Sequence, residues 1–250
     1  MKNTGSWYVV KLEDGSMANC KIKGNFRLKG IRTTNPVAVG DEVVVEVKDG
    51  ASYIVSIETR RNYIIRRASN LSKESQILAA NIDQALVFFA AAEPDPNLGL
   101  LDRFLLKMEF KEIPTILGFN KCDLIDTAKR EELQAIYNAS GYPVVFVSVK
   151  NETDLDELRK LLDGKTTVLA GPSGVGKSSL MNWLLPEAEM ETGAVSEKIK
   201  RGRHTTRHSE IIPIHGNTYI MDTPGFSTLN IPGFEKEDLQ QYYREFADYE

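Results

Sequence analysis

The sequence is poor in cysteine and has no long run of apolar residues. Its two cysteines, Cys20 and Cys122, lie far apart, which argues against a disulfide framework and against a cysteine-rich zinc site within the chain. The densest apolar run, Ala85–Ala92, is much shorter than the ~20 residues of a membrane helix. Met1–Trp7 also lacks the apolar core of a signal peptide. We therefore expect a cytoplasmic protein without a membrane partner.

The charged residues are unevenly distributed along an otherwise ordinary globular composition. The 250 residues are 42% hydrophobic and 26% charged, which suits one large domain or two smaller ones. The net charge is −4, yet residues 1–68 carry 12 Lys and Arg against 7 Asp and Glu. A basic first third on an acidic remainder suggests that a polyanion such as nucleic acid binds there. The alternative is an ordinary solvated surface.

Residues 1–68 have the pattern of short β-strands separated by turns. Such strands in a small barrel would form an OB-like fold, although strand count alone does not separate it from an SH3-like barrel. The next residues are polar, and we expect residues 69–81 to be a linker. The expected strands are Ser6–Leu12, Met17–Ile22, Glu42–Lys48, Tyr53–Glu58 and Tyr63–Arg67.

Residues 82–229 alternate between apolar strands and amphipathic helices. This alternation predicts an α/β domain with a mostly parallel sheet that has helices on both faces. In such sheets ligands bind beyond the carboxyl ends of the strands. The expected strands are Ala85–Ala92, Pro114–Phe119, Val144–Val147, Thr167–Ala170 and Thr218–Met221, and the expected helices are Leu100–Lys111, Ala128–Ala139, Leu155–Leu162 and Lys177–Leu185.

A phosphate-binding loop is the strongest motif. Residues 171–178 read G-P-S-G-V-G-K-S, directly after an apolar strand and directly before a helix, which makes a chance glycine-rich turn a poor explanation. Backbone N–H groups would surround the phosphates, Lys177 would reach the β- and γ-phosphates, and Ser178 would bind Mg²⁺. The expected phosphate-binding residues are Gly171, Pro172, Ser173, Gly174, Val175, Gly176, Lys177, Ser178 and Ser179.

Three further motifs stand at the ends of strands of the same domain. Asp123 of Asn120-Lys121-Cys122-Asp123 could accept two guanine N–H groups, whereas adenine would leave it unpaired, and Asn120 would join this loop to the phosphate-binding loop. Ser148-Val149-Lys150 could close the base pocket. In Asp222-Thr-Pro-Gly225, Asp222 could hold Mg²⁺ and the Gly225 N–H could bind the γ-phosphate. Alone, each of these motifs is also an ordinary turn.

The order of these motifs is unusual, because the base-recognition motifs precede the phosphate-binding loop. The sequence is therefore similar to circularly permuted GTPases. It also resembles the family of ribosome small-subunit-dependent GTPase A (RsgA) over essentially its whole length. The motifs that carry this resemblance are G-P-S-G-V-G-K-S-S, D-T-P-G-F and R-G-R-H-T-T. This resemblance implies an N-terminal OB-fold, contact with ribosomal RNA, and GTP hydrolysis stimulated by the small ribosomal subunit during its late maturation. The family also has a C-terminal zinc-binding segment. Residues 230–250 would begin a C-terminal helical segment, but no Cys and His cluster occurs, so zinc is expected only if a segment beyond Glu250 exists.

The segment Lys200–His208 stands where GTPases have a mobile switch. Thr205 or Thr206 would bind Mg²⁺ and contact the γ-phosphate, and the sequence does not choose between them. Phe226 occupies the place after Gly225 where many GTPases have a glutamine that positions water. His204 could position that water instead, or it could bond only to backbone.

We expect a GTPase that uses Mg²⁺, binds GTP, GDP and the small subunit with its RNA, and acts as a monomer. The alternatives are a permuted GTPase that acts on another RNA or assembly, and a GTP-dependent ribosome-binding module with negligible hydrolysis, which Phe226 suggests. The expected RNA contacts cluster around one loop of the barrel and are Lys21, Lys23, Arg27, Lys29 and Arg32.

Overall fold

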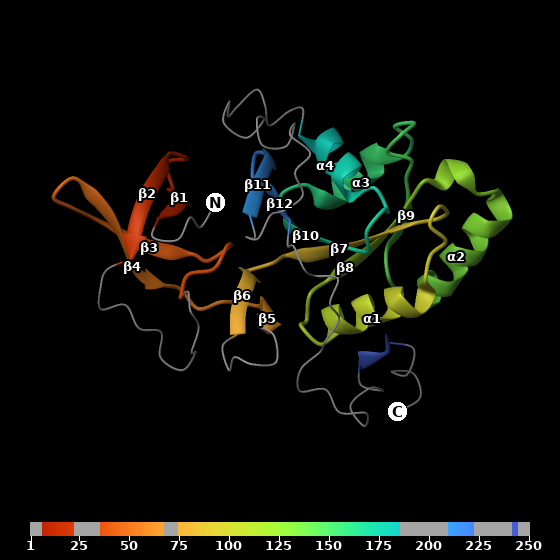
Figure 1. Ribbon diagram of the computed structural model, residues 1–250, viewed down its shortest axis with the longest axis horizontal. Helices are drawn as coiled ribbons and strands as arrows, with labels where there is room; N and C mark the ends of the chain where they lie inside the picture. The colour runs from red at the N-terminus through yellow and green to blue at the C-terminus, as the bar shows by residue number, and fades with distance from the viewer. Residues whose placement is uncertain (1–6, 23–35, 68–74, 186–209, 223–241, 245–250) are drawn as a thin grey trace. The chain divides into compact units, whose positions relative to one another are not determined.

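The structure is a computed structural model, and it describes residues 7–22, 36–67, 75–185, 210–222 and 242–244 (Figure 1). The chain divides into two compact units, one built mainly from residues 1–82 and the other mainly from the residues after them. The expected fold class is confirmed, with an N-terminal strand domain followed by a mixed α/β domain. In the part of the chain that the structure describes, no helix is long and apolar enough to cross a membrane.

The first unit contains a four-stranded sheet with the order β1-β2-β4-β3. β1 and β2 are antiparallel, β2 and β4 are parallel, and β3 and β4 form a hairpin. The hairpin turn consists of Asp49 and Gly50, whose φ angles of 50° and 74° suit a two-residue turn. The strands are β1 (Tyr8–Lys11), β2 (Met17–Ile22), β3 (Val43–Lys48) and β4 (Ala51–Ile57).

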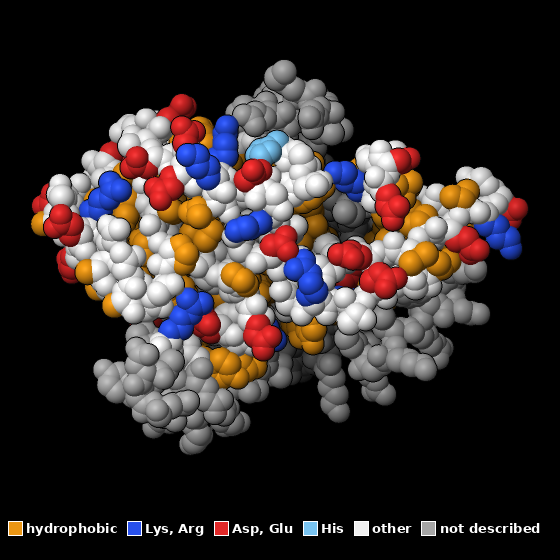
Figure 2. Space-filling model, turned by 180° about the vertical axis from the view of Figure 1, so that it is seen from behind, with side chains coloured by type: hydrophobic (Ala, Val, Ile, Leu, Met, Phe, Trp, Pro, Cys, Tyr) orange, Lys and Arg blue, Asp and Glu red, His pale blue; other side chains and the backbone are white. Residues whose placement is uncertain are grey.

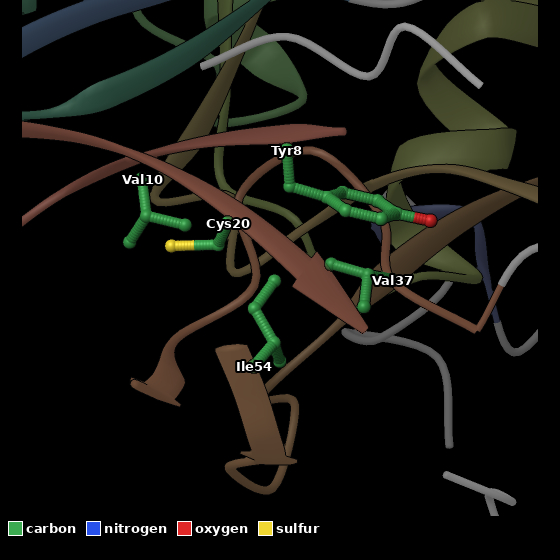
Figure 3. Close-up of a cluster of buried hydrophobic side chains, with 5 residues drawn as sticks. All are labelled: Tyr8, Val10, Cys20, Val37 and Ile54. Carbon is green, nitrogen blue, oxygen red and sulfur yellow. The ribbon is translucent and has the colours of Figure 1, made fainter. Parts of the chain in front are cut away.

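One face of this sheet forms a small apolar core. The buried side chains of neighbouring strands point toward one another, as the alternation of a half-buried strand requires (Figure 3). Cys20 is one of them, and burial raises the pKa of its thiol. The core residues are Tyr8, Val10, Cys20, Val37 and Ile54.

The fifth expected strand, β5 (Tyr63–Arg67), lies outside the four-stranded sheet. It pairs antiparallel with β6 (Ser75–Ala80), which occupies much of the segment expected to be a linker, residues 69–81. The linker prediction therefore missed this strand. The polar run before β6 has a composition typical of turns. β6 is a strand because it pairs with β5, and the sequence of β6 alone does not reveal this pairing.

Asparagine side chains hold the open end of the β5–β6 hairpin, where β5 begins and β6 ends. The Asn62 amide forms two bonds of 2.8 Å with the backbone N–H and carbonyl of Ile82. Asn81, in the left-handed conformation with φ 54°, accepts from Arg61 N–H and donates to the Gly40 carbonyl. An added Cβ on Gly40 would lie 2.1 Å from the Ala80 carbonyl oxygen, so this approach requires glycine.

A buried ion pair joins Asp41, the residue after Gly40, to Arg60. Both carboxylate oxygens of Asp41 accept from the Arg60 guanidinium at 2.6 Å, and the Arg60 and Asp41 side chains are 8% and 0% exposed. Arg60 also donates to the Pro36 carbonyl, and Asp41 accepts from the Ala38 N–H. The pair is thus supported by hydrogen bonds to the backbone on both sides, which is how proteins tolerate buried charges.

A six-stranded sheet, formed mainly by residues of the second unit, has the order β11-β12-β10-β7-β8-β9. β7 pairs in parallel with both β10 and β8, and β8 pairs in parallel with β9. β7 and β8 are buried along their whole length, which explains their nearly continuous apolar sequences. The strands are β7 (Gln84–Ala90), β8 (Thr115–Asn120), β9 (Val144–Phe146), β10 (Thr166–Ala170), β11 (Glu210–His215) and β12 (Thr218–Asp222).

Four helices cover the sheet, with α1 and α2 on one face and α3 and α4 on the other (Figure 1). The first two begin at side-chain caps, since Asn97 accepts from Leu100 N–H and Asp126 accepts from Lys129 N–H. A short 3-10 helix, η1 (Cys122–Leu124), comes after β8. The α-helices are α1 (Leu98–Glu109), α2 (Thr127–Ala139), α3 (Leu155–Leu162) and α4 (Lys177–Leu184).

The sequence did not predict β11. Pro213 interrupts its apolar run, and proline cannot donate to a neighbouring strand. β11 stands first in the strand order, at an edge of the sheet, where proline is tolerated.

Removing one partner of the Asp41–Arg60 pair should strongly destabilise the first unit. Arg60→Met leaves a buried carboxylate without its cation, and we expect the free energy of unfolding to fall by about 3–5 kcal/mol. Urea denaturation measures this change. The matched control is Arg61→Met, which alters an exposed neighbour and should cost less than about 1 kcal/mol. Equal stability of the two variants would show that the pair does not stabilise the fold.

Candidate nucleotide-binding site

The strand order places three loops at one edge of the sheet. The chain runs from β7 through β8 to β9 and then returns to the opposite side of β7 as β10. The loops after β8, β9 and β10 therefore share the carboxyl edge of parallel strands. The order in which the chain adds strands to the sheet reverses between β7 and β10. Ligands bind at such a point in open α/β sheets.

The phosphate-binding loop joins β10 to α4. Gly171 has a φ angle of 144°, and an added Cβ there would lie 2.0 Å from the Phe88 carbonyl oxygen. Gly176 has a φ angle of 95°, and its added Cβ would lie 2.2 Å from the Asn120 side-chain nitrogen. Both positions require glycine because strands β7 and β8 approach the loop so closely.

Lys177 folds its side chain back over the loop. Its ammonium donates to the Gly171 carbonyl oxygen at 2.8 Å and also to the Pro172 carbonyl. These bonds hold a positive charge at the N-terminal end of α4, where the helix dipole also favours an anion. Ser178 comes next in the first turn of the helix and is exposed, as Ser173 and Ser179 are.

Asn120 connects the three loops. Its side chain donates to the Val175 carbonyl oxygen at 2.9 Å and accepts from the Val149 N–H at 3.1 Å, and the residue is 4% exposed. The expected link between Asn120 and the phosphate-binding loop is therefore present. The second bond, to the loop after β9, was not predicted, because a backbone N–H has no signature in the sequence.

Ser148 orients the Asp123 carboxylate. The Ser148 hydroxyl donates to Asp123 Oδ1 at 2.6 Å and accepts from the Asn151 N–H at 3.2 Å. Ser148 is 1% exposed and its backbone forms two bonds with Thr153, so the hydroxyl is fixed in place. Asp123 is itself exposed, and its carboxylate stands at the surface of the edge where the three loops meet. Lys150 is exposed in the loop that carries Ser148.

Lys121 ties a fourth loop to the same edge. It has the left-handed conformation, with φ 61°, and its ammonium donates to the Glu93 carbonyl in the loop between β7 and α1. An added Cβ on Gly174 would stand 3.9 Å from the Pro94 ring, so this loop also approaches the phosphate-binding loop. Sequence reasoning missed the loop because it carries no motif.

Several predicted residues lie outside the part of the chain that the structure describes. For Asp222, only its place as the last residue of β12 is described. Among the described residues, no group of three His, Cys, Asp or Glu side chains could hold a metal ion. The predicted residues outside the described ranges are His204, Thr205, Thr206, Gly225, Lys23, Arg27, Lys29 and Arg32.

The predicted RNA-binding residue Lys21 is exposed on β2, and its ammonium lies 4.4 Å from the centre of the Trp7 ring. Figure 2 shows acidic and basic side chains interspersed over one face of the molecule. Four of the five predicted RNA contacts lie outside the described residues, so the structure places only Lys21.

Comparison with known proteins relates the whole chain to one family. Residues 57–232 match the model of the RsgA GTPase, and residues 1–54 match that of the RsgA N-terminal domain. A small ribosomal subunit biogenesis GTPase RsgA of Phocaeicola vulgatus is 48% identical over 253 residues, which cover 100% of this chain and 82% of the relative. A protein of the same name from Agathobacter rectalis is 48% identical over 263 residues, with the same coverage.

Two solved structures have the same fold. YjeQ from Thermotoga maritima has a TM-score of 0.74 and 31% identity, covering 98% of this chain and 80% of its own. YloQ, described as a circularly permuted GTPase, has a TM-score of 0.73 and 32% identity, covering 99% of this chain and 77% of its own. With both family models, these relatives and these structures in agreement, the chain belongs to the family of RsgA GTPases, whose nucleotide-binding domain is circularly permuted.

Proposed function

We propose that this chain hydrolyses GTP to GDP and phosphate during late maturation of the small ribosomal subunit, and that the subunit stimulates its turnover. The single observation that carries the nucleotide part is the Asn120 side chain, which joins the loop that bears Asp123 to the phosphate-binding loop. The ribosomal part is supported by the relatives, which are named for biogenesis of the small subunit.

Guanine recognition is assigned to Asp123. The Ser148 bond uses one side of a carboxylate oxygen and leaves acceptor capacity for the ring N–H and exocyclic amine of guanine. Adenine has an acceptor at the ring position and would face the carboxylate unpaired. Lys121 and Lys150 flank the base pocket in this proposal.

Phosphate binding is assigned to the backbone N–H groups of residues 171–176 and to Lys177, whose ammonium would exchange loop carbonyls for phosphate oxygens. The hydroxyl of Ser178 and the carboxylate of Asp222 are the oxygen donors that Mg²⁺ prefers, with Thr205 or Thr206 as a further ligand. When bound, Mg²⁺ would neutralise charge on the β- and γ-phosphates. The Gly225 N–H would bind the γ-phosphate.

The basic residues of the strand domain would contact ribosomal RNA. They are Lys21 together with Lys23, Arg27, Lys29 and Arg32. We propose that the protein acts as a monomer in the cytoplasm, where GTP, GDP and maturing subunits are its partners.

Replacing Asp123 should change base preference. Asp123→Asn exchanges one acceptor for a donor, so GTP binding should weaken by several kcal/mol. Xanthosine triphosphate has a carbonyl in place of the exocyclic amine, so it should bind better to the variant than to the wild type. Titration of both nucleotides measures this exchange, with Asp126→Asn as control because Asp126 caps α2. Unchanged preference in the Asp123 variant would place the base elsewhere.

GTP turnover with and without small subunits tests the proposal. We expect the wild-type rate to rise on adding subunits, and His204→Ala to lose about 10²–10⁴-fold of the stimulated rate while keeping GTP affinity and subunit binding. His208→Ala, outside the threonine pair, should lose less, and Lys177→Ala serves as the inactive control.

The outcomes separate the alternatives. Turnover that subunits do not stimulate would contradict the ribosomal role, and negligible turnover in both conditions would favour a GTP-dependent binding module. A normal stimulated rate in His204→Ala would make that histidine structural.

A further inference from the structure

The outer face of the four-stranded sheet carries aromatic rings beside lysines. Trp7, next to the first residue of β1, is 43% exposed. Tyr8 and Cys20 pair across β1 and β2 and point into the core, so the neighbouring Trp7 and Lys21 are on the opposite face. The 4.4 Å distance between the Lys21 ammonium and the Trp7 ring shows that the two side chains meet there.

The register extends this row across the sheet. Lys21 pairs with Tyr53 of β4, and Tyr53 pairs with Glu46 of β3. Since the next residue, Ile54, is in the core, Tyr53 belongs to the outer face. Lys21 therefore stands between two aromatic residues.

A second row on the same face adds another lysine. Lys11 lies four residues after Trp7, on the same side of β1, and pairs with Met17 of β2, which is 58% exposed. The outer face thus combines an accessible indole ring with two ammonium groups on adjacent strands.

This combination fits an unpaired nucleotide. Aromatic rings on strands stack with single-stranded bases, and lysines beside them bind the phosphates. A paired base cannot reach such a ring, because it is already stacked within a helix. At an exposed site the contact between an ammonium and an indole is weaker than a base stacked on the ring, so Lys21 can leave the ring for a phosphate.

We propose that Trp7 stacks on an unpaired RNA base and that Lys11 and Lys21 bind the adjacent phosphates. The proposal rests on the proposed ribosomal function, which brings this chain to RNA, and it names the kind of RNA that the strand domain takes. Trp7 was not among the RNA contacts predicted from the sequence, because those were chosen by their positive charge.

Tryptophan fluorescence gives a direct test, because the chain has two tryptophans, Trp7 and Trp183. In a Trp183→Phe background Trp7 is the sole reporter. A ten-nucleotide single strand without self-complementarity should quench its emission, and a duplex of the same length should quench it much less. Equal quenching by both, or none by the single strand, would overturn the stacking.

Affinity for the labelled single strand provides the matched comparison. Trp7→Leu should bind roughly tenfold more weakly, the order expected for one lost stacked base, Trp7→Phe should recover much of the loss, and Trp183→Phe should bind as the wild type does. If Trp7→Leu and Trp7→Phe bind equally, the ring has only a structural role. Subunit-stimulated GTP turnover of the wild type is measured in parallel. If that stimulation persists while the stacking fails, only this proposal is overturned; if it is absent in the wild type, the proposed function fails.

Discussion

The nucleotide site depends on one buried side-chain amide. Asn120 uses its nitrogen on the phosphate-binding loop and its oxygen on the loop after β9, while its own backbone ends β8. Both polar ends are satisfied in a position that is 4% exposed, and a buried amide that lost either partner would carry a free-energy penalty. Gly176 is part of the same arrangement, since any Cβ there would collide with the amide nitrogen. The base loop and the phosphate loop are therefore held at a fixed separation.

The same contacts explain how the fold tolerates its permuted order. They join Asn120 to residues 29 and 55 positions away, and they depend on which strands are neighbours rather than on which comes first. The permutation does change the destination of the chain after Asp222, because the chain continues from β12 toward its last described residues. Among these, Tyr242 packs edge-on against Phe110, and Arg244 pairs with Glu109 at 2.8 Å. Residues beyond the proposed γ-phosphate-binding motif thus contact the C-terminal end of α1.

The sequence predicted the parts of the molecule whose structure is determined by residues close together in the chain. The phosphate-binding loop was predicted from glycine spacing between a strand and a helix, and β7 and β8 were predicted from continuous apolar runs. The strand β6 was missed because its pairing with β5 is not visible in its own pattern, and β11 was missed because Pro213 masks an edge strand. The Lys121 bond to the Glu93 carbonyl could not be predicted either, since its acceptor is backbone 28 residues away. Roles assigned to residues 204–206 and 225 remain predictions.

Nucleotide binding by Asn120→Ala tests the central claim most directly. Titration with fluorescent GDP and with fluorescent GTP should show that both bind at least about tenfold more weakly than to the wild type. The reason is that the variant loses two buried hydrogen bonds and with them the fixed separation of the loops. Asn151→Ala is the matched control, since Asn151 contributes its backbone N–H to the site, and it should bind both nucleotides as the wild type does. Wild-type affinity for GTP and GDP in Asn120→Ala would show that the loops do not depend on this side chain and would contradict the account.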